Sequence, residues 1–449
     1  MPAMTPAATV AAGRGRRHAA AALTVVLLVA GCGSAPSPSA SPTASPPPFA
    51  TVSPAPSPDA SATPIPPGDL AALYARIEDE VIAERGLPAK ARIVPTILSE
   101  AELRARMEEQ FGKDNPPDEV AIAQGTLQGL GLLPAGASLA DLYIELLASQ
   151  VAGYYDPETK QLYVVSRSGT IGATEKVTVA HELTHALQDQ SFGLAGIDVD
   201  AVGQGDRSLA RLALVEGDAT LLMTKWLTKH LGAAELGELL KVDPEAQALL
   251  DGMPAILRET LLFPYQQGLV FVNGLWMSGG WEAVDRAYGR LPASTEQVLH
   301  PDKYAAGEEP VTVALDAAAL AKALGAGWVA TPEDTLGEFQ LSVWLRENGV
   351  PALDAQAAAA GWGGDRLVYL RGPDGAYGIV LATAWDTAAD TAEFRAAATR
   401  AAGRLPGAAR VVVGSSSGAS GRPGEILVLA ASDAATLGAL ADAVAAAGP

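Results

Sequence analysis

Two histidines four residues apart, with a glutamate directly after the first, form the HExxH pattern His181-Glu182-Leu183-Thr184-His185. On a helix this spacing places both imidazoles on one face, one turn apart. Two neutral imidazoles can bind one Zn²⁺ and leave positions for a third ligand and a water. The carboxylate of Glu182 would then accept a proton from that water. The spacing therefore predicts a metal-dependent hydrolase, and a peptidase is the expected kind.

A third ligand is expected from a second long helix, predicted over residues 207–231. We assign this role to Glu216, which falls at the edge of an apolar stripe on that helix. A carboxylate in such a place needs a compensating partner, which a metal supplies, and Gly217 leaves room for close approach. The alternative is that Glu216 reaches water or pairs with Arg211. The stripe consists of Leu212, Val215, Ala219, Leu222, Met223 and Trp226.

Other polar residues have weaker claims to a role in the site. The oxyanion of an amide hydrolysis would need a hydrogen-bond donor, and His300 and Tyr265 are the candidates. For both, a structural role in a core or loop is the favoured alternative. Asp189 is expected to orient a ligand or to end its helix rather than to bind metal. His230 ends a helix and is expected to act there as a favourable cation.

The elements around the motif are predicted from periodicity and turn residues. Residues 153–166 read as a hairpin that turns at Asp156-Pro157, and the motif helix should cover residues 174–190. The hairpin strand nearest the helix could pair with an extended peptide substrate. Residues 191–206 read as a loop. Upstream we expect a helix from Asp69, a strand over 92–98, a helix from a Ser99–Glu102 capping box to 112, and helices over 117–130 and 138–150.

The character of the chain changes after residue 332, and residues 333–449 predict a small α+β module in the order ββαββα. Gly361–Gly364 lacks the Lys and Ser/Thr of a phosphate-binding loop, so a tight turn is expected there. The whole chain is expected to be α+β, with a mostly helical domain and a small sheet over 69–332. The module's predicted elements are helices 334–348 and 352–360, a hairpin 366–387 turning at 373–375, a helix, strands 409–414 and 425–431, and a helix 433–446.

The N-terminus predicts export. Basic residues precede an apolar stretch and the run Leu-Val-Ala-Gly-Cys that ends at Cys32, as in bacterial lipoprotein signals. Residues 1–31 are therefore expected to be removed and Cys32 to be acylated, with a simple secretory signal as the alternative. Residues 32–68 are almost wholly Ser, Ala, Pro and Thr and predict a disordered tether. The protein is expected outside the cytoplasm, anchored by lipid to the bacterial cell membrane.

The length and the net charge of the chain limit the number of domains and the classes of partner that we expect. The 449 residues are too many for one ordinary core, so two or three domains are expected. The net charge of −20 repels phosphate backbones and argues against nucleic acid as a partner. Cys32 is the single cysteine, which excludes an intramolecular disulfide.

Together these residues resemble a known class of enzymes. HExxH on one helix, completed by a glutamate from a later helix, is similar to the zincin metallopeptidases of the gluzincin kind. Several stretches also resemble an uncharacterised group of bacterial envelope proteins presumed to be peptidases. These stretches are GYYDPETKQLYVV, VAHELTHALQDQ, ALVEGDAT, FPYQQGLVFV (263–272), STEQVLHPDKY (294–304) and GWGGDR (361–366).

The resemblance implies that His181, His185 and Glu216 bind zinc and that Glu182 is the general base. Thermolysin-like relatives place an aspartate four residues after the ligand glutamate to orient the first histidine. Here that position is Thr220, with Asp218 nearby, so the groups that orient the ligands differ. Two alternatives to a peptidase remain at this point. One is a binding or scaffold lipoprotein without turnover, and the other is a zinc hydrolase of a non-peptide cell-envelope substrate.

Overall fold

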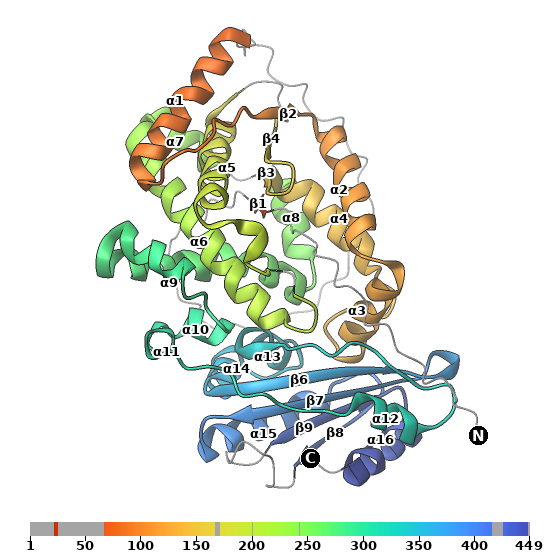
Figure 1. Cartoon of the computed structure of the whole chain (residues 1–449). Helices are drawn as coiled ribbons and strands as arrows, with labels where there is room; N and C mark the ends of the chain where they lie inside the picture. The colour runs from red at the N-terminus through yellow and green to blue at the C-terminus, as the bar shows by residue number, and fades with distance from the viewer. Residues whose placement is uncertain are drawn as a thin grey trace, which may run out of the picture.

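A computed structural model describes residues 22–25, 67–166, 171–199, 201–241, 243–414 and 425–447. Within these ranges the chain is α+β, as expected, with two separate sheets among many helices. Figure 1 shows the helices α1 to α9 around the smaller sheet in the upper part and the five-stranded sheet in the lower part.

The described residues form helices α1 to α16 and strands β1 to β9. The helices are α1 (Pro67–Arg85), α2 (Glu100–Asp114), α3 (Pro117–Gly129), α4 (Leu139–Gln150), α5 (Ala173–Phe192), α6 (Gly205–His230), α7 (Ala233–Leu239), α8 (Pro244–Gly252), α9 (Ala255–Tyr288), α10 (Thr295–Leu299), α11 (Pro301–Ala306), α12 (Ala317–Leu324), α13 (Gly337–Glu347), α14 (Ala352–Ala359), α15 (Ala388–Ala402) and α16 (Ala434–Ala447). The strands are β1 (Ala22–Val25), β2 (Thr96–Leu98), β3 (Val151–Asp156), β4 (Gln161–Val165), β5 (Val329–Ala330), β6 (Trp362–Arg371), β7 (Tyr377–Trp385), β8 (Ala408–Val413) and β9 (Ile426–Ala431). Short 3₁₀ turns cover Leu194–Gly196 and Pro373–Gly375.

The motif helix α5 packs on the smaller sheet, whose strand order is β1-β3-β4-β2. The predicted hairpin is β3 and β4, paired antiparallel, and β2 joins β4 in parallel. Helix α5 can lie close to β3 because Gly153 has no side chain. A Cβ there would lie 2.6 Å from Thr178 Cγ2 and 2.7 Å from Tyr163 O. The apolar side of α5, including Leu183 and Leu187, is buried in the core below the sheet.

Helices α6 and α9 cross at backbone contact. A Cβ on Gly217 would lie 2.2 Å from Gly268 O, and a Cβ on Gly268 would lie 2.2 Å from Ala213 O. Two glycines facing one another therefore allow the helices to approach more closely than any larger residues would. The room that Gly217 leaves is used by α9, and this crossing fixes α6 beside the motif helix.

Gly268→Ala is expected to lower the free energy of unfolding by about 1–3 kcal/mol or more, because its methyl group would overlap the Ala213 carbonyl. Gly274→Ala is the matched control on the same helix, since a Cβ there meets no atom of the described residues within 4 Å. It should be neutral or stabilise by up to about 1 kcal/mol. Urea denaturation of both variants measures the difference, and equal effects would contradict the close crossing.

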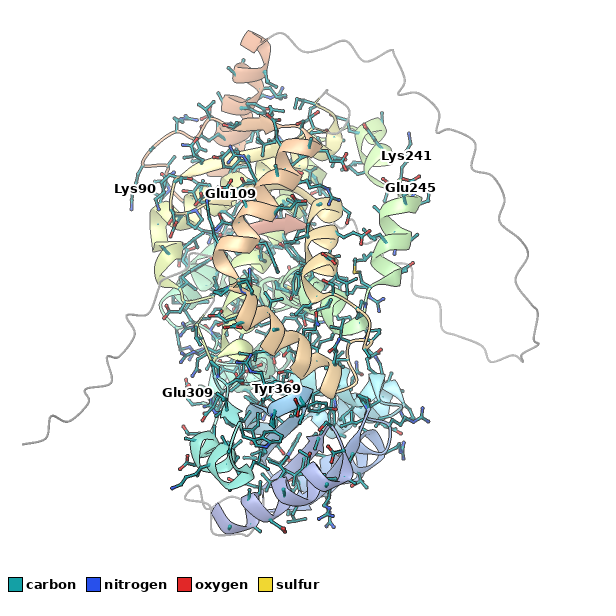
Figure 2. The ribbon with its side chains drawn as sticks, turned by 90° about the vertical axis from the view of Figure 1, so that its right-hand side faces the viewer. Lys90, Glu109, Lys241, Glu245, Glu309 and Tyr369 are labelled. Atoms are coloured by element: carbon teal, nitrogen blue, oxygen red, sulfur yellow. The ribbon has the colours of Figure 1, made fainter. Side chains whose placement is uncertain are left out.

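The five-stranded sheet has the order β5-β6-β7-β9-β8, with antiparallel neighbours. Alternate residues of β6 and β7 point to opposite faces, as the strand period requires. One face packs on α12 and α16, and the other on α13, α14 and α15. The core on the second face continues through Leu130 and Leu139 into the upper helices. In Figure 2, Tyr369 marks the place where α3 meets this sheet, against Gly125.

Local predictions upstream and at the C-terminus mostly agree with the structure. The capping box is present: Ser99 N donates to Glu102 Oε2 at 2.8 Å, and Glu102 N donates to Ser99 Oγ at 3.3 Å. The strand predicted over 92–98 is shorter, since β2 begins at Thr96. The ββαββα order of the C-terminal module is observed, but β5 (Val329–Ala330) adds an edge strand from before residue 333.

The tight turn predicted at Gly361–Gly364 is wrong. Gly361 has a φ of 76°, but residues from Trp362 onward belong to strand β6. The glycine run is explained by crowding instead, because a Cβ on Gly364 would lie 2.4 Å from Val311 O. The Asp365 carboxylate accepts from the amides of Leu336 and Gly337, at the start of α13, and thereby joins this strand to the helix.

The N-terminal predictions fall mainly outside the described ranges. Cys32 and the tether as far as residue 66 lie there, as does the predicted signal apart from Ala22–Val25, which is β1 and pairs antiparallel with β3. Among the residues that the structure does describe, none of the helices combines the length and the apolar character needed to cross a bilayer.

Candidate metal centre

Helices α5 and α6 bring His181, His185 and Glu216 together at one point. His185 Nε2 lies 3.0 Å from His181 Nε2, and Glu216 Oε2 lies 3.2 Å from His181 Nε2 and 3.3 Å from His185 Nε2. The two histidines project from adjacent turns of α5, as their spacing requires. The glutamate comes from the neighbouring helix α6, 31 residues later in the chain than His185.

Glu216 lies within this cluster and does not reach solvent, because only 1% of its surface is exposed. The alternative that it pairs with Arg211 does not hold. Arg211 Nη1 instead donates to Ile197 O at 2.8 Å and lies 3.7 Å from Asp198 Oδ2. Glu216 therefore has the imidazoles as its partners, inside the protein.

The dimensions of the cluster fit a tetrahedral ion. At ligand distances of about 2.0–2.1 Å from zinc, two ligand atoms lie about 3.3 Å apart. The three donor atoms are separated by 3.0, 3.2 and 3.3 Å. Two imidazole nitrogens and one carboxylate oxygen are also a donor set that leaves a fourth position for water. The residues present thus fit a catalytic zinc ion.

The charges in the cluster are strongly coupled. Burial opposes ionisation of Glu216, but the two imidazoles outweigh it and lower the pKa of Glu216 to about 2. Burial also opposes charge on His185, yet the adjacent Glu216 raises the pKa of His185 to about 9. The two groups thus favour an ion pair in which Glu216 is ionised, and a divalent ion can take the place of the positive charge.

Glu182 lies between the motif helix and strand β3. Its side chain is fully buried, and the backbone amide of Tyr155 hydrogen-bonds to its carboxylate. The Glu182 Cγ also lies near Gly153, 3.5 Å from where a Cβ would stand on that glycine. Burial, and to a lesser degree the Glu216 charge, raise the pKa of Glu182 well above its ordinary value. A carboxylate with a raised pKa is suited to accept a proton and to pass it on.

The two candidate oxyanion donors have different positions. Tyr265, on α9, is buried beside the cluster, with its ring centroid 6.3 Å from that of His181. His300 belongs elsewhere, because its Nε2 lies 2.9 Å from Glu338 Oε1, at the edge of a pocket of about 600 Å³. The lining of that pocket includes none of the cluster residues. Tyr265 is the candidate that the fold keeps near the cluster, and His300 has a structural partner.

Asp189 and His230 have structural contacts. Asp189 Oδ2 accepts from Tyr155 Oη at 2.8 Å and from Lys160 Nζ at 2.6 Å, and Oδ1 accepts from the Leu194 amide at 3.1 Å. It thereby ties the hairpin to the end of α5. His230 is the last residue of α6, with Nδ1 3.4 Å from Glu80 Oε1.

A second group of acids, Glu296, Glu308 and Asp386, is an ion-pair cluster. Lys303 Nζ donates to Glu296 Oε1 at 2.6 Å, to Glu308 Oε1 at 3.2 Å and also to Asp386 Oδ2. An ammonium group already occupies the centre of these carboxylates, so they lack the place for a metal that the histidine cluster offers.

The sequence analysis missed the group that orients His185. His185 Nδ1 lies 2.8 Å from Gln188 Oε1, and Gln188 Nε2 donates to Asp218 Oδ2 and to Val215 O, both at 3.0 Å. Asp218 in turn pairs with Arg85. Gln188 lies three residues after His185 on the same helix, a spacing that could have drawn attention to it.

Thr220 does not replace the aspartate that orients the first histidine in thermolysin-like relatives. Within the described part of the chain, neither Thr220 Oγ1 nor His181 Nδ1 has a hydrogen-bond partner. Asp218, the other candidate, contacts Gln188 and thus serves the second histidine rather than the first. The hydrogen bonds around the two histidines therefore differ from the thermolysin-like pattern.

Comparison with known proteins bears on the C-terminal part alone. Residues 327–436 match the model of a family described as Domain of unknown function (DUF8575). No curated protein and no solved structure was found to match the chain. The matched residues include the five-stranded sheet, helices α13 to α15 and the first residues of α16, and they do not include α12 or the candidate metal centre.

Proposed function

We propose that this protein is a zinc-dependent peptidase with a zincin-like core of the gluzincin kind. The observation that carries the proposal is the meeting of His181, His185 and Glu216 within hydrogen-bond distances, beside the buried Glu182. A purely structural zinc site has no use for a nearby general base, so Glu182 favours catalysis over a scaffold role.

His181, His185 and Glu216 would hold the zinc ion. When bound, zinc supplies Lewis-acid chemistry and lowers the pKa of a water to about 7. Glu182 accepts the proton of the attacking water and delivers it to the leaving amine. The Tyr155 amide keeps the Glu182 carboxylate in place for this transfer. The phenol of Tyr265, whose ring lies beside that of His181, is the donor that we assign to stabilise the oxyanion of a peptide carbonyl.

An extended peptide is the substrate that the hairpin favours. Strand β3 contacts α5, and its Tyr155 amide bonds to Glu182; without β1 it would be an edge strand, which can bind an extended peptide through backbone hydrogen bonds. The chain's own segment Ala22–Val25 pairs antiparallel with this edge. That segment belongs to the predicted signal, so cleavage before Cys32 would remove it and free the edge for substrate.

The place of action follows from the N-terminal sequence. We assign the mature protein to the outer face of the bacterial cell membrane, held by lipid at Cys32. In the sequence, the segment rich in Ser, Ala, Pro and Thr lies between Cys32 and the first residues of α1. The enzyme would thus act on peptides or proteins of the cell envelope.

The test is metal analysis and substrate profiling of the purified full chain. We expect about one zinc per chain, cleavage of members of a broad peptide library, and loss of both in chelator with recovery on added zinc. Absence of stoichiometric zinc, with a thermal stability that chelator leaves unchanged, would refute the proposal. Zinc binding without cleavage of any peptide would favour a non-catalytic lipoprotein or a non-peptide envelope substrate.

A further inference from the structure

We infer that Gln188 and Asp218 are positioning residues that hold the proton of His185 on Nδ1 and so leave Nε2 free to bind the metal. The inference rests on the proposed function insofar as His185 is a zinc ligand. It concerns which ring nitrogen carries a proton, which is a property of the chain's own hydrogen bonds.

Asp218 is an acceptor at both of its oxygens. Arg85 Nε donates to Asp218 Oδ1 at 2.8 Å and Arg85 Nη2 donates to Oδ2 at 3.0 Å, and both side chains are fully buried. Tyr288 Oη donates to the same Oδ2 at 2.8 Å. Burial and the Asp218 charge raise the pKa of Tyr288 well above 10, so the phenol keeps its proton. A carboxylate paired with a guanidinium in this way accepts only.

The accepting role of Asp218 determines how the Gln188 amide is oriented. The end of this side chain lies 3.0 Å from Asp218 Oδ2 and 3.0 Å from the Val215 carbonyl oxygen. Both neighbours are acceptors, so the NH₂ group must face them, and its two hydrogens are used. The reverse orientation would place the amide oxygen against two other oxygens within the protein. Gln188 Oε1 is therefore the atom that faces His185.

An amide oxygen can only accept, so His185 Nδ1, at 2.8 Å, must carry a hydrogen. This holds whether the ring is neutral or an imidazolium. In the neutral ring Nε2, which faces Glu216 and His181, is then the nitrogen without a hydrogen and is free to bind a metal. The hydrogen bond from Nδ1 also fixes the plane of the ring and increases the basicity of Nε2.

The arrangement depends on a residue far from the motif. Arg85 is the last residue of α1, 96 positions before His181. Its guanidinium also donates to Asp285 Oδ1 at 2.7 Å and lies 4.6 Å above the Trp281 ring. Helices α1, α5, α6 and α9 are thus joined through one buried chain of polar groups that ends on a metal ligand. The side chains that lead from Arg85 through Asp218 and Gln188 to His185 are all buried, so water does not compete directly for these hydrogen bonds.

Two variants test the inference in the full-length protein. Gln188→Met removes the acceptor for Nδ1, and Asp218→Asn replaces one acceptor by a donor and loosens the orientation of Gln188. Each is expected to weaken zinc binding by about 10–100-fold, measured by competition with a chromophoric chelator. Selective ¹⁵N-histidine labelling should show a hydrogen-bonded proton on His185 Nδ1 in the parent. That signal should shift or be lost in both variants.

The controls make the same chemical changes at residues that contact neither Gln188 nor His185. Gln190→Met lies on the same helix but contacts Ala91, and Asp285→Asn contacts the same guanidinium but not Gln188. Both should keep the affinity and the Nδ1 signal of the parent. Equal zinc affinities in Asp218→Asn and Asp285→Asn, with Nδ1 protonated in both, would overturn the inference. A parent without zinc affinity would instead refute the proposed function, and the Nδ1 signal would still report on the hydrogen bonds.

Discussion

Replacing Glu182 by glutamine is expected to abolish most peptide hydrolysis while zinc stays bound. A general base contributes about 10²–10⁴-fold to the rate, and an amide cannot accept the water proton. Gln keeps the size of the side chain and can still accept from the Tyr155 amide, so the packing under β3 should not change. The rate constant kcat on a cleaved peptide and the zinc content of the variant are the two measurements.

Glu175→Gln is the matched control for this variant. It makes the same substitution on the same helix, where the carboxylate accepts from the Gly172 amide at 2.8 Å and the amide oxygen can do so too. Its kcat should equal that of the parent. If Glu182→Gln retained the parental rate with zinc bound, Glu182 would not be the base.

Removal of the Glu216 carboxylate is the second large effect. Glu216→Ala should weaken zinc binding by more than about 100-fold, because loss of a group that merely orients a ligand already weakens it by about 10–100-fold. Zinc at 100 times its Kd stabilises a folded protein by about 2.7 kcal/mol. The parent should therefore melt at a higher temperature with zinc than with chelator, and in Glu216→Ala this difference should vanish.

Asp189→Asn separates metal binding from general stability. Asp189 is also a buried acid of this region, but its partners are Tyr155, Lys160 and the Leu194 amide. Its loss should lower the melting temperature with and without zinc by similar amounts, so that the stabilisation by zinc persists. A zinc-dependent shift that survived in Glu216→Ala would mean that another group completes the site.

The fold explains why the cluster can exist inside the protein. His181, Glu182 and His185 have no exposed surface, and Glu216 has 1%. Buried ionisable groups are costly unless they are paired, and here each has a partner on a neighbouring element. The close crossing of α6 and α9 at Gly217 and Gly268, together with the small Gly153 under α5, brings these elements within reach of one another. The glycines thus allow the helices and the strand that carry these polar residues to pack closely together.

Local spacing made part of the site predictable. The i, i+4 relation determines that His181 and His185 share a face, because helix geometry depends on neighbouring residues alone. The apolar stripe of residues 212–226 likewise indicated that Glu216 would lie at the edge of a core. The Ser99–Glu102 capping box and the hairpin turn at Asp156 were readable for the same reason, since each is a contact between residues a few positions apart.

Residues 232–332 contain helices that local spacing did not predict. The structure has six helices starting in that stretch of the described chain, α7 to α12, and the sequence analysis assigned none of them. Helix α9 carries Pro264 within it and two residues with non-helical angles, Gly279 and Gly280. Such residues interrupt local signals of a helix, and packing against α6 maintains it instead. The glycines before Asp365 were misread because crowding by Val311, a residue of another segment, explains them.

The amino-acid sequence by itself predicted the kind of chemistry that we propose, because the histidine pair and the adjacent acid lie in one short stretch whose helix geometry is local. Only the tertiary structure decided which distant groups complete and orient the pair. It brought Glu216 to the imidazoles, placed Tyr265 near and His300 elsewhere, and linked Arg85 to His185 through Asp218 and Gln188. These pairings depend on how helices cross, which is a result of packing over the whole core and leaves no periodic trace along the chain.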